Sequence, residues 1–226
     1  MQGMIEAIRA VARDEDQRLS HARIGVVTSV HGAGDAPDHA CTVRLRETGL
    51  VLPRVPMAVG LLGAASLPQE DDLVVVLFVE GDLHAPIVIG RLYTDTVEPP
   101  PHGPGEVVIA LPERETDADK QLIVRLVTPG DGTRALSVAL GGDVAVAVDI
   151  DDGGVSVTVG DTALTLTQSG SSDGEAKLSA GDAAITLSQG GDVTVETSGK
   201  LTLSAREVEI AGDATVKVAG QTIKLN

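Results

Sequence analysis

The sequence predicts an all-β protein, with a small barrel near the N-terminus and a long array of short strands behind it. From residue 22 onwards, apolar and polar residues alternate with a period of two, which is the period of a half-buried strand. Gly, Pro and Asp separate these alternating segments at short intervals. Phe78 and Tyr93 are the only aromatic residues, so the second half of the chain must bury a thin, aliphatic interior.

Residues 1–20 are the exception to this period and predict a helix. Met4, Ile5, Ile8 and Val11 recur at helical spacing and give that helix an apolar stripe. A lone helix of this kind must pack against something. Either its own barrel or a partner protein would serve.

Five strands are expected in the barrel domain, residues 21–97. The alternating segments are ARIGVVTSV, CTVRLRET, LVLPRVPMAV, DLVVVLFVEG and HAPIVIGRLY. Five short strands without intervening helices are typical of a small closed barrel such as the OB-fold. The last two strands are expected to form a hairpin around residues 80–82, with Gly81 at positive φ.

A proline-rich stretch, EPPPHGPG, resists both helix and sheet and marks the domain boundary at residues 98–105. We assign residues 98–135 to a linker and neck, and residues 136–226 to the strand array. Gly–Asp steps recur in the array at irregular intervals, and each precedes a short alternating strand. TALTLT after Gly160-Asp161 and AAITLS after Gly181-Asp182 are two examples.

Each strand of the array offers only two or three aliphatic side chains to a core. Burying one Val or Leu contributes about 1.5–3 kcal/mol, whereas ordering each residue costs about 1–2 kcal/mol. Two arrangements bury more: a single chain coiled into a wide solenoid, or three chains whose layers are triangles of three strands. The irregular spacing and the missing aromatic residues favour the second, a homotrimeric needle built as a triple-stranded β-helix.

The composition argues against several functions. A net charge of −16 without a basic cluster argues against nucleic-acid binding. Cys41 is the single cysteine, and we expect it to be a small buried residue. The histidines show no metal-ligand spacing, and the carboxylates of Asp151-Asp152 and residues 70–72 fall in turn-like segments. We therefore expect no catalytic residue, no metal and no cofactor.

The segment GDLHAPIVIGRLY, residues 81–93, resembles the hairpin that closes the OB-fold of phage baseplate spike proteins. These proteins form the baseplate assembly protein V family, which is related to the VgrG proteins of type VI secretion. The matching positions are Gly81, Asp82, Pro86, Gly90, Leu92 and Tyr93. The short helix before the barrel and the strand array after it also fit, so the resemblance covers nearly the whole chain.

The resemblance implies a non-enzymatic central spike. Such spikes sit as trimers in the baseplate of a contractile tail or injection system, where sheath contraction drives them through the envelope of a target cell. The carrier remains open among a virion, a tailocin-like particle and a bacterial injection system. Residues 1–9 lack the apolar core of a signal peptide, so we expect synthesis in the cytoplasm followed by assembly in a baseplate.

The resemblance also implies two partners. VgrG proteins carry a hub domain that this chain lacks, so a separate baseplate hub protein is expected to hold the barrel through the stripe of residues 4–11. Some relatives end in a His-x-His pair that binds iron, but the last histidine here is His102. A PAAR-repeat tip protein is therefore expected to cap the chain end. The expected contact residues are Thr222, Ile223, Lys224, Leu225 and Asn226.

Two other classes of protein are alternatives to the spike. A trimeric fibre or adhesin would share the strand array. A β-helical carbohydrate-active enzyme is disfavoured because the second half of the chain offers no aromatic residue to a sugar.

Overall fold

The computed structural model describes residues 22–32 and 38–224, so the helix expected over residues 1–20 lies outside the described residues. The chain divides into two compact units, Met1–Pro99 and Pro100–Asn226. This division falls inside the proline-rich stretch. Within the described ranges, no helix has the length and apolar character needed to cross a membrane.

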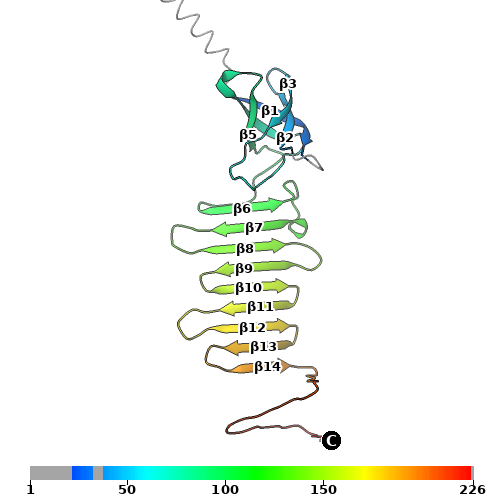
Figure 1. Cartoon of the computed structure of the whole chain (residues 1–226), viewed down its shortest axis with the longest axis vertical. Coiled ribbons are helices and arrows are strands. Elements are labelled where there is room, and N and C mark those ends of the chain that lie inside the picture. Colours follow the sequence, from blue (N-terminus) through cyan, green and yellow to red (C-terminus); the bar gives the residue numbers. More distant parts are fainter. Residues whose placement is uncertain (1–21, 33–37, 225–226) are drawn as a thin grey trace, which may run out of the picture. The chain divides into compact units, whose positions relative to one another are not determined.

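Five strands build the first unit, and they coincide with the five alternating segments of the sequence. They are β1 (Ala22–His31), β2 (Ala40–Leu45), β3 (Val51–Pro56), β4 (Leu73–Phe78) and β5 (Pro86–Leu92). Successive side chains of a strand point to opposite faces, so the alternation sends one side of each strand inward. Figure 1 shows the strands curling around a common interior.

The strand order β3-β2-β1-β4-β5 closes into a barrel. β1 pairs antiparallel with both β2 and β4. A parallel bridge between Met57 and Val88 joins the two ends of the sheet, and the Ala58 N–H donates to the Val88 carbonyl oxygen at 2.8 Å. A five-stranded sheet closed in this way is the OB-like barrel that the strand pattern predicts.

Small aliphatic side chains fill the barrel. Its buried cluster is Val27, Cys41, Val43, Leu45, Leu52, Val55, Val74, Val76, Phe78 and Val88. Phe78 is the largest of these side chains. Cys41 is fully buried beside them, which confirms the prediction of a small buried residue.

The β4–β5 hairpin turns over Val79–Gly81, as predicted for residues 80–82. Gly81 has a φ of 78°, and Glu80 before it also has positive φ, at 53°. The Asp82 carboxylate then accepts a hydrogen bond from the His84 N–H at 2.8 Å. Glycine at positive φ and an aspartate that accepts from the backbone two residues on are the usual means of fixing such a turn.

A nine-stranded sheet makes up most of the second unit. Its strands are β6 (Glu106–Leu111), β7 (Leu122–Val127), β8 (Ala135–Leu140), β9 (Val146–Asp151), β10 (Gly154–Val159), β11 (Thr162–Thr167), β12 (Glu175–Ala180), β13 (Ala183–Ser188) and β14 (Val193–Thr197). Each strand pairs with its neighbour in sequence, so the sheet is an uninterrupted meander. β6 and β7 lie within residues 98–135, the segment that we assigned to a linker and neck.

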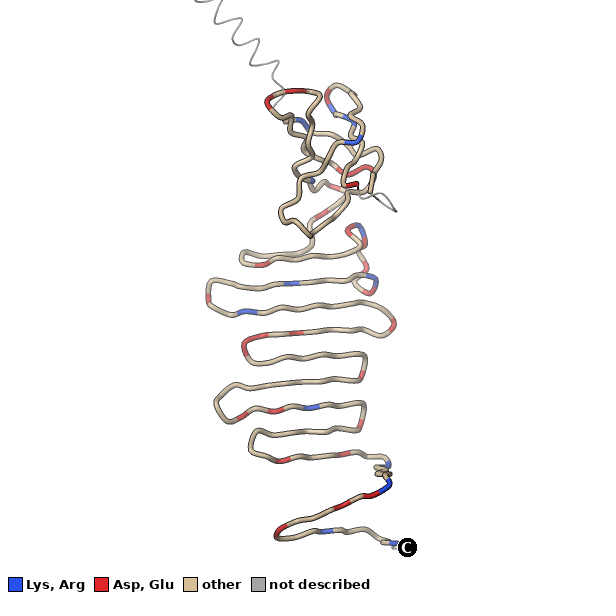
Figure 2. The backbone as a smooth tube through the Cα atoms, in the orientation of Figure 1, with Lys and Arg blue, Asp and Glu red and all other residues tan. Residues whose placement is uncertain are grey.

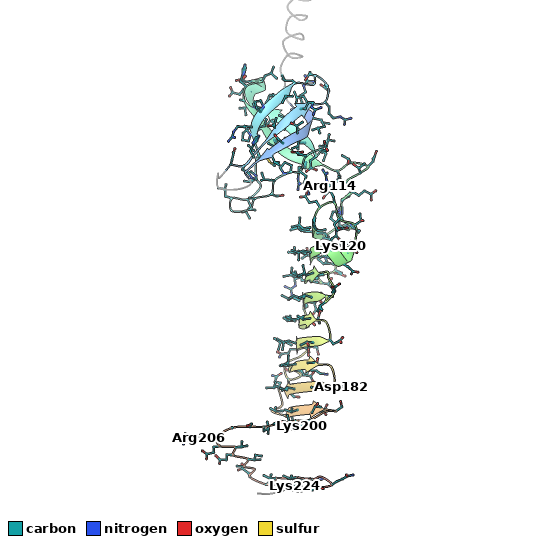
Figure 3. All side chains as sticks on the ribbon, turned by 90° about the vertical axis from the view of Figure 1, so that its right-hand side faces the viewer. Arg114, Lys120, Asp182, Lys200, Arg206 and Lys224 are labelled. Atoms are coloured by element: carbon teal, nitrogen blue, oxygen red, sulfur yellow. The ribbon has the colours of Figure 1, made fainter. Side chains whose placement is uncertain are left out.

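The meander ends at Thr197. Residues 198–224 continue the alternation, with segments such as LTLS and ATVKV, yet they form no strand in the described chain. After Lys200 the chain leaves the plane of the sheet, and Arg206 lies to one side of it (Figure 3). An alternating segment without a neighbouring strand has no partner for its backbone N–H and C=O groups.

The two aromatic residues give a matched test of the barrel. Phe78→Ala removes the largest core side chain and should lower the barrel's free energy of unfolding by about 3–5 kcal/mol. Tyr93→Ala removes a ring that is 62% exposed and should change it by about 0.5 kcal/mol or less. Hydrogen exchange of peptides from β1–β5, followed by mass spectrometry, measures the change in the barrel's stability for each variant. Similar losses of protection in the two variants would contradict the assigned core.

Candidate assembly interface

In an antiparallel sheet, residues that pair directly across neighbouring strands point to the same face. In the nine-stranded sheet the paired aliphatic residues therefore lie on one side, which we call the apolar side. They form three columns that cross all nine strands. The first column is Val107, Leu126, Leu136, Ile150, Val155, Leu166, Ala176, Leu187 and Val193. The second is Ile109, Val124, Val138, Val148, Val157, Leu164, Leu178, Ile185 and Val195. The third is Leu111, Leu122, Leu140, Val146, Val159, Thr162, Ala180, Ala183 and Thr197.

The other side of the sheet, the polar side, has the opposite composition. From β8 to β14 it carries no apolar side chain larger than alanine. Its residues there include Ser137, Asp149, Ser156, Thr158, Thr165, Lys177, Thr186 and Glu196. Such side chains suit contact with water. Only the apolar side therefore gains stability when another protein surface covers it.

The single chain leaves much of the apolar side exposed. Leu164 is 42%, Ile185 41% and Val195 50% exposed. None of the buried apolar residues of the described chain lies in the second unit. Apolar area removed from water stabilises by about 25 cal/mol per Å², so this sheet gains much more from covering its apolar side than the single chain provides.

Many of the sheet's charged residues lie at its turns (Figure 2), and none occurs in the three columns. The Asp151 carboxylate accepts hydrogen bonds from the N–H groups of Gly153 and Gly154, at 2.7 and 2.9 Å. Asp152 forms an ion pair with Arg134 at 2.6 Å. The pair Asp151-Asp152 therefore holds a turn, as the sequence predicts.

The second carboxylate cluster, residues 70–72, also serves the fold. Asp72 is only 8% exposed. It accepts a hydrogen bond from the Gln69 N–H at 2.9 Å and lies 3.4 Å from Arg91. A carboxylate held by a backbone N–H and a guanidinium has a structural explanation without acid or base chemistry.

The hairpin residues that carry the family resemblance fall into two groups. Gly81, Asp82 and Pro86 shape the turn and the start of β5. Gly90, Leu92 and Tyr93 are exposed instead. A Cβ added at Gly90 would have no neighbour within 4 Å, so the fold of the single chain does not require glycine there.

The residues expected to contact other proteins are separated in the chain. The expected hub-contact residues Met4, Ile5, Ile8 and Val11 lie outside the described residues. The same holds for Leu225 and Asn226 at the expected cap site. The remaining cap residues, Thr222, Ile223 and Lys224, are exposed and belong to no strand, and Ile223 is 53% exposed.

The described residues contain no group of three or more His, Cys, Asp or Glu side chains placed to hold a metal ion. His31 shares a hydrogen bond with the Thr42 hydroxyl at 2.9 Å, and His102 with the Pro100 carbonyl oxygen at 2.8 Å. These contacts stay within the chain's own strands and loops.

Sequence reasoning missed the upper part of the apolar side. The columns begin at Val107, Ile109 and Leu111 on β6, thirty or so residues before the array that we expected at 136. The signal was present, because EVVIAL and LIVRLV alternate in the same way as the later strands. The proline-rich stretch before them and the longer loop between them concealed it.

An OB-like barrel followed by a sheet with an uncovered apolar side is typical of a structural component of an assembly. Residues 23–93 match the family model of the Type VI secretion system/phage-baseplate injector OB domain. The match spans the barrel and ends with the 81–93 hairpin, and it supports a structural role in a baseplate. No curated protein matches the chain.

Burial raises the pKa of the Cys41 thiol to about 11, so the thiol stays protonated at neutral pH. We predict that a thiol reagent at pH 8 modifies the folded protein at least about 100-fold more slowly than the denatured chain, because the side chain is fully buried and its raised pKa also lowers the thiolate fraction. The rate for folded protein should rise as the pH approaches 11. Equal rates for folded and denatured protein would reveal an accessible, reactive cysteine instead.

Proposed function

We propose that this chain is the structural central spike of a contractile tail or injection-system baseplate, and that it works as a homotrimer. The observation that carries the proposal is the uncovered apolar side, in a chain whose barrel matches the injector OB domain. Three copies related by a three-fold axis turn their apolar sides inward and their polar sides to water. Each layer of the resulting prism is a triangle of three strands, which is the arrangement of a triple-stranded β-helix.

The role is mechanical and needs no catalytic residue. Within each copy, neighbouring layers are held by the hydrogen bonds of the meander. Between copies, the three columns form a continuous aliphatic interior. A prism of this kind resists compression because displacing any layer exposes apolar surface in all three copies. Sheath contraction drives it through the envelope of the target cell.

Two further proteins complete the proposed assembly. A separate hub protein holds the barrel, through the apolar stripe of residues 4–11. A PAAR-repeat protein covers the end of the prism around residues 222–226. The assembled spike belongs to the baseplate of a virion or injection particle.

Two substitutions on β13 test the trimer. Ile185→Asp places a carboxylate in the second column, where burial without a partner is costly, so the variant should lose the trimer. Thr186→Asp, its neighbour on the polar side, should remain trimeric. Native mass spectrometry of the wild type should give three times the mass of one chain. A monomeric wild type, or an Ile185→Asp variant that stays trimeric, would contradict the proposal.

The cap is tested by truncation. A PAAR-repeat protein from the same particle should bind the full-length trimer, and a chain that ends before Thr222 should lose that binding while staying trimeric. Native mass spectrometry reports both properties. Binding that survives the truncation, or no binding to full-length protein, would remove the cap from the proposal without affecting the trimer.

A further inference from the structure

The two edges of the apolar side differ in size over β11–β14. In the third column the upper strands carry large residues, from Leu111 to Val159. The lower strands carry small ones: Thr162, Ala180, Ala183 and Thr197. The first column keeps the large Leu166 and Leu187, carries Ala176 on β12, and ends in Val193, which is close in size to Thr197 at the other end of β14.

The turns reinforce this difference. At the third-column end, β10 and β11 are joined by the two residues 160–161, and β12 and β13 by the two residues 181–182. At the first-column end the connections are longer, residues 168–174 and 189–192. We name the third-column end of β11–β14 the thin edge and the first-column end the thick edge.

The two loops of the thick edge are tied to each other. The Gln189 side chain accepts a hydrogen bond from the Gly174 N–H at 2.9 Å and donates one to the Ser171 carbonyl oxygen at 3.0 Å. Gln168 donates to the Gly170 carbonyl oxygen at 2.9 Å within its own loop. These bonds fix the loops in place without a partner chain.

A hollow of about 520 Å³ lies at the thick edge. Its lining includes the first-column residues Val155, Leu166, Ala176 and Leu187 and the loop residues Gln168 and Gln189. This open hollow lies beside uncovered aliphatic columns, where a protein surface with small side chains and a narrow turn can pack.

We propose that the thin edge of one copy packs into the hollow at the thick edge of the next copy. The proposal rests on the trimer proposed above and specifies its corners. In a closed three-fold assembly each copy presents one edge to one neighbour and the other edge to the second, so every corner joins unlike edges. Because the three copies are related by rotation alone, equivalent residues lie at the same height along the three-fold axis. Ala183 of one copy therefore lies beside Leu187 of the next.

The side chains at the two edges indicate which surface packs into the hollow at the thick edge. The difference in size comes from β11, with Leu166 at one edge and Thr162 at the other, and from β13, whereas β12 carries alanine at both edges. β13 carries Leu187 at one edge and Ala183 at the other. Two thick edges would clash at a corner, whereas two thin edges would leave a void. Where unlike edges meet, Leu166 and Leu187 of one copy lie beside the smaller Thr162 and Ala183 of the next.

A cysteine pair on β13 tests this contact in the full chain. We would replace both Ala183 and Leu187 with cysteine. Four residues along a strand separate these positions by roughly 13 Å, beyond the limit of about 7 Å between the Cα atoms of a disulfide. Any crosslink between them must therefore join two copies. Oxidation, or a short bifunctional maleimide, should give a covalent trimer on a non-reducing gel, and either single variant should give none.

The matched control carries Ala184→Cys and Ser188→Cys. These positions lie on the same strand at the same spacing but on the polar side, so they should not crosslink. Wild-type protein, with its buried Cys41, should also stay uncrosslinked. A second measurement covers the case in which the cysteine pair fails to fold: Ala183→Leu should lower the thermal midpoint of the trimer, whereas Ala184→Leu should not.

The outcomes separate this proposal from the proposed function. A native trimer without a 183–187 crosslink, or one that crosslinks through a single cysteine, would overturn the edge contact and leave the spike intact. Covalent dimers together with a native dimer mass would overturn both, because a two-fold sandwich would then cover the apolar side. Equal thermal midpoints for Ala183→Leu and Ala184→Leu would also count against the edge contact.

Discussion

The second unit of this protein is limited by a simple constraint: a single-layered sheet cannot bury its own apolar side. Its three columns, aliphatic except at Thr162 and Thr197, cross nine strands, and none of the buried apolar residues of the described chain belongs to that sheet. Strands β7 to β13 are hydrogen-bonded on both sides within the chain, and β6 and β14 on one side. The sheet can therefore form its hydrogen bonds alone, but it reaches stability only when other surfaces cover the columns.

Unlike the sheet, the barrel encloses its own apolar core. Its five strands close on themselves through the Met57–Val88 bridge, so both ends of the sheet meet and a valine-rich cluster is enclosed. The barrel is thus a self-sufficient fold, and it is the part of the chain that matches the injector OB domain. The two units divide the work proposed for a spike: a stable platform for attachment to a baseplate, and a shaft whose stability depends on trimerisation.

Several features of the barrel were predictable because they are local. Alternation over ten residues sets each strand, Gly81 and Asp82 set the hairpin, and the aromatic-poor composition sets a narrow interior. For the strand array, the sequence predicted short alternating strands but not where the array begins and ends. β6 and β7 were missed since a proline-rich stretch precedes them, and residues 198–224 alternate without forming strands because no neighbour in the chain pairs with them.

The sequence by itself determined that the protein is all-β, that Cys41 is buried and that the second half needs a thin aliphatic interior. Those properties follow from composition and from a period of two, which any strand imposes on its neighbours. Only the tertiary structure decided that the strands pair in one chain as a meander and that their registers align into columns. It also revealed that the two edges of those columns differ in size. In this meander the register of each pair depends on the length and geometry of the turn that joins the two strands, which the alternation within one strand does not specify.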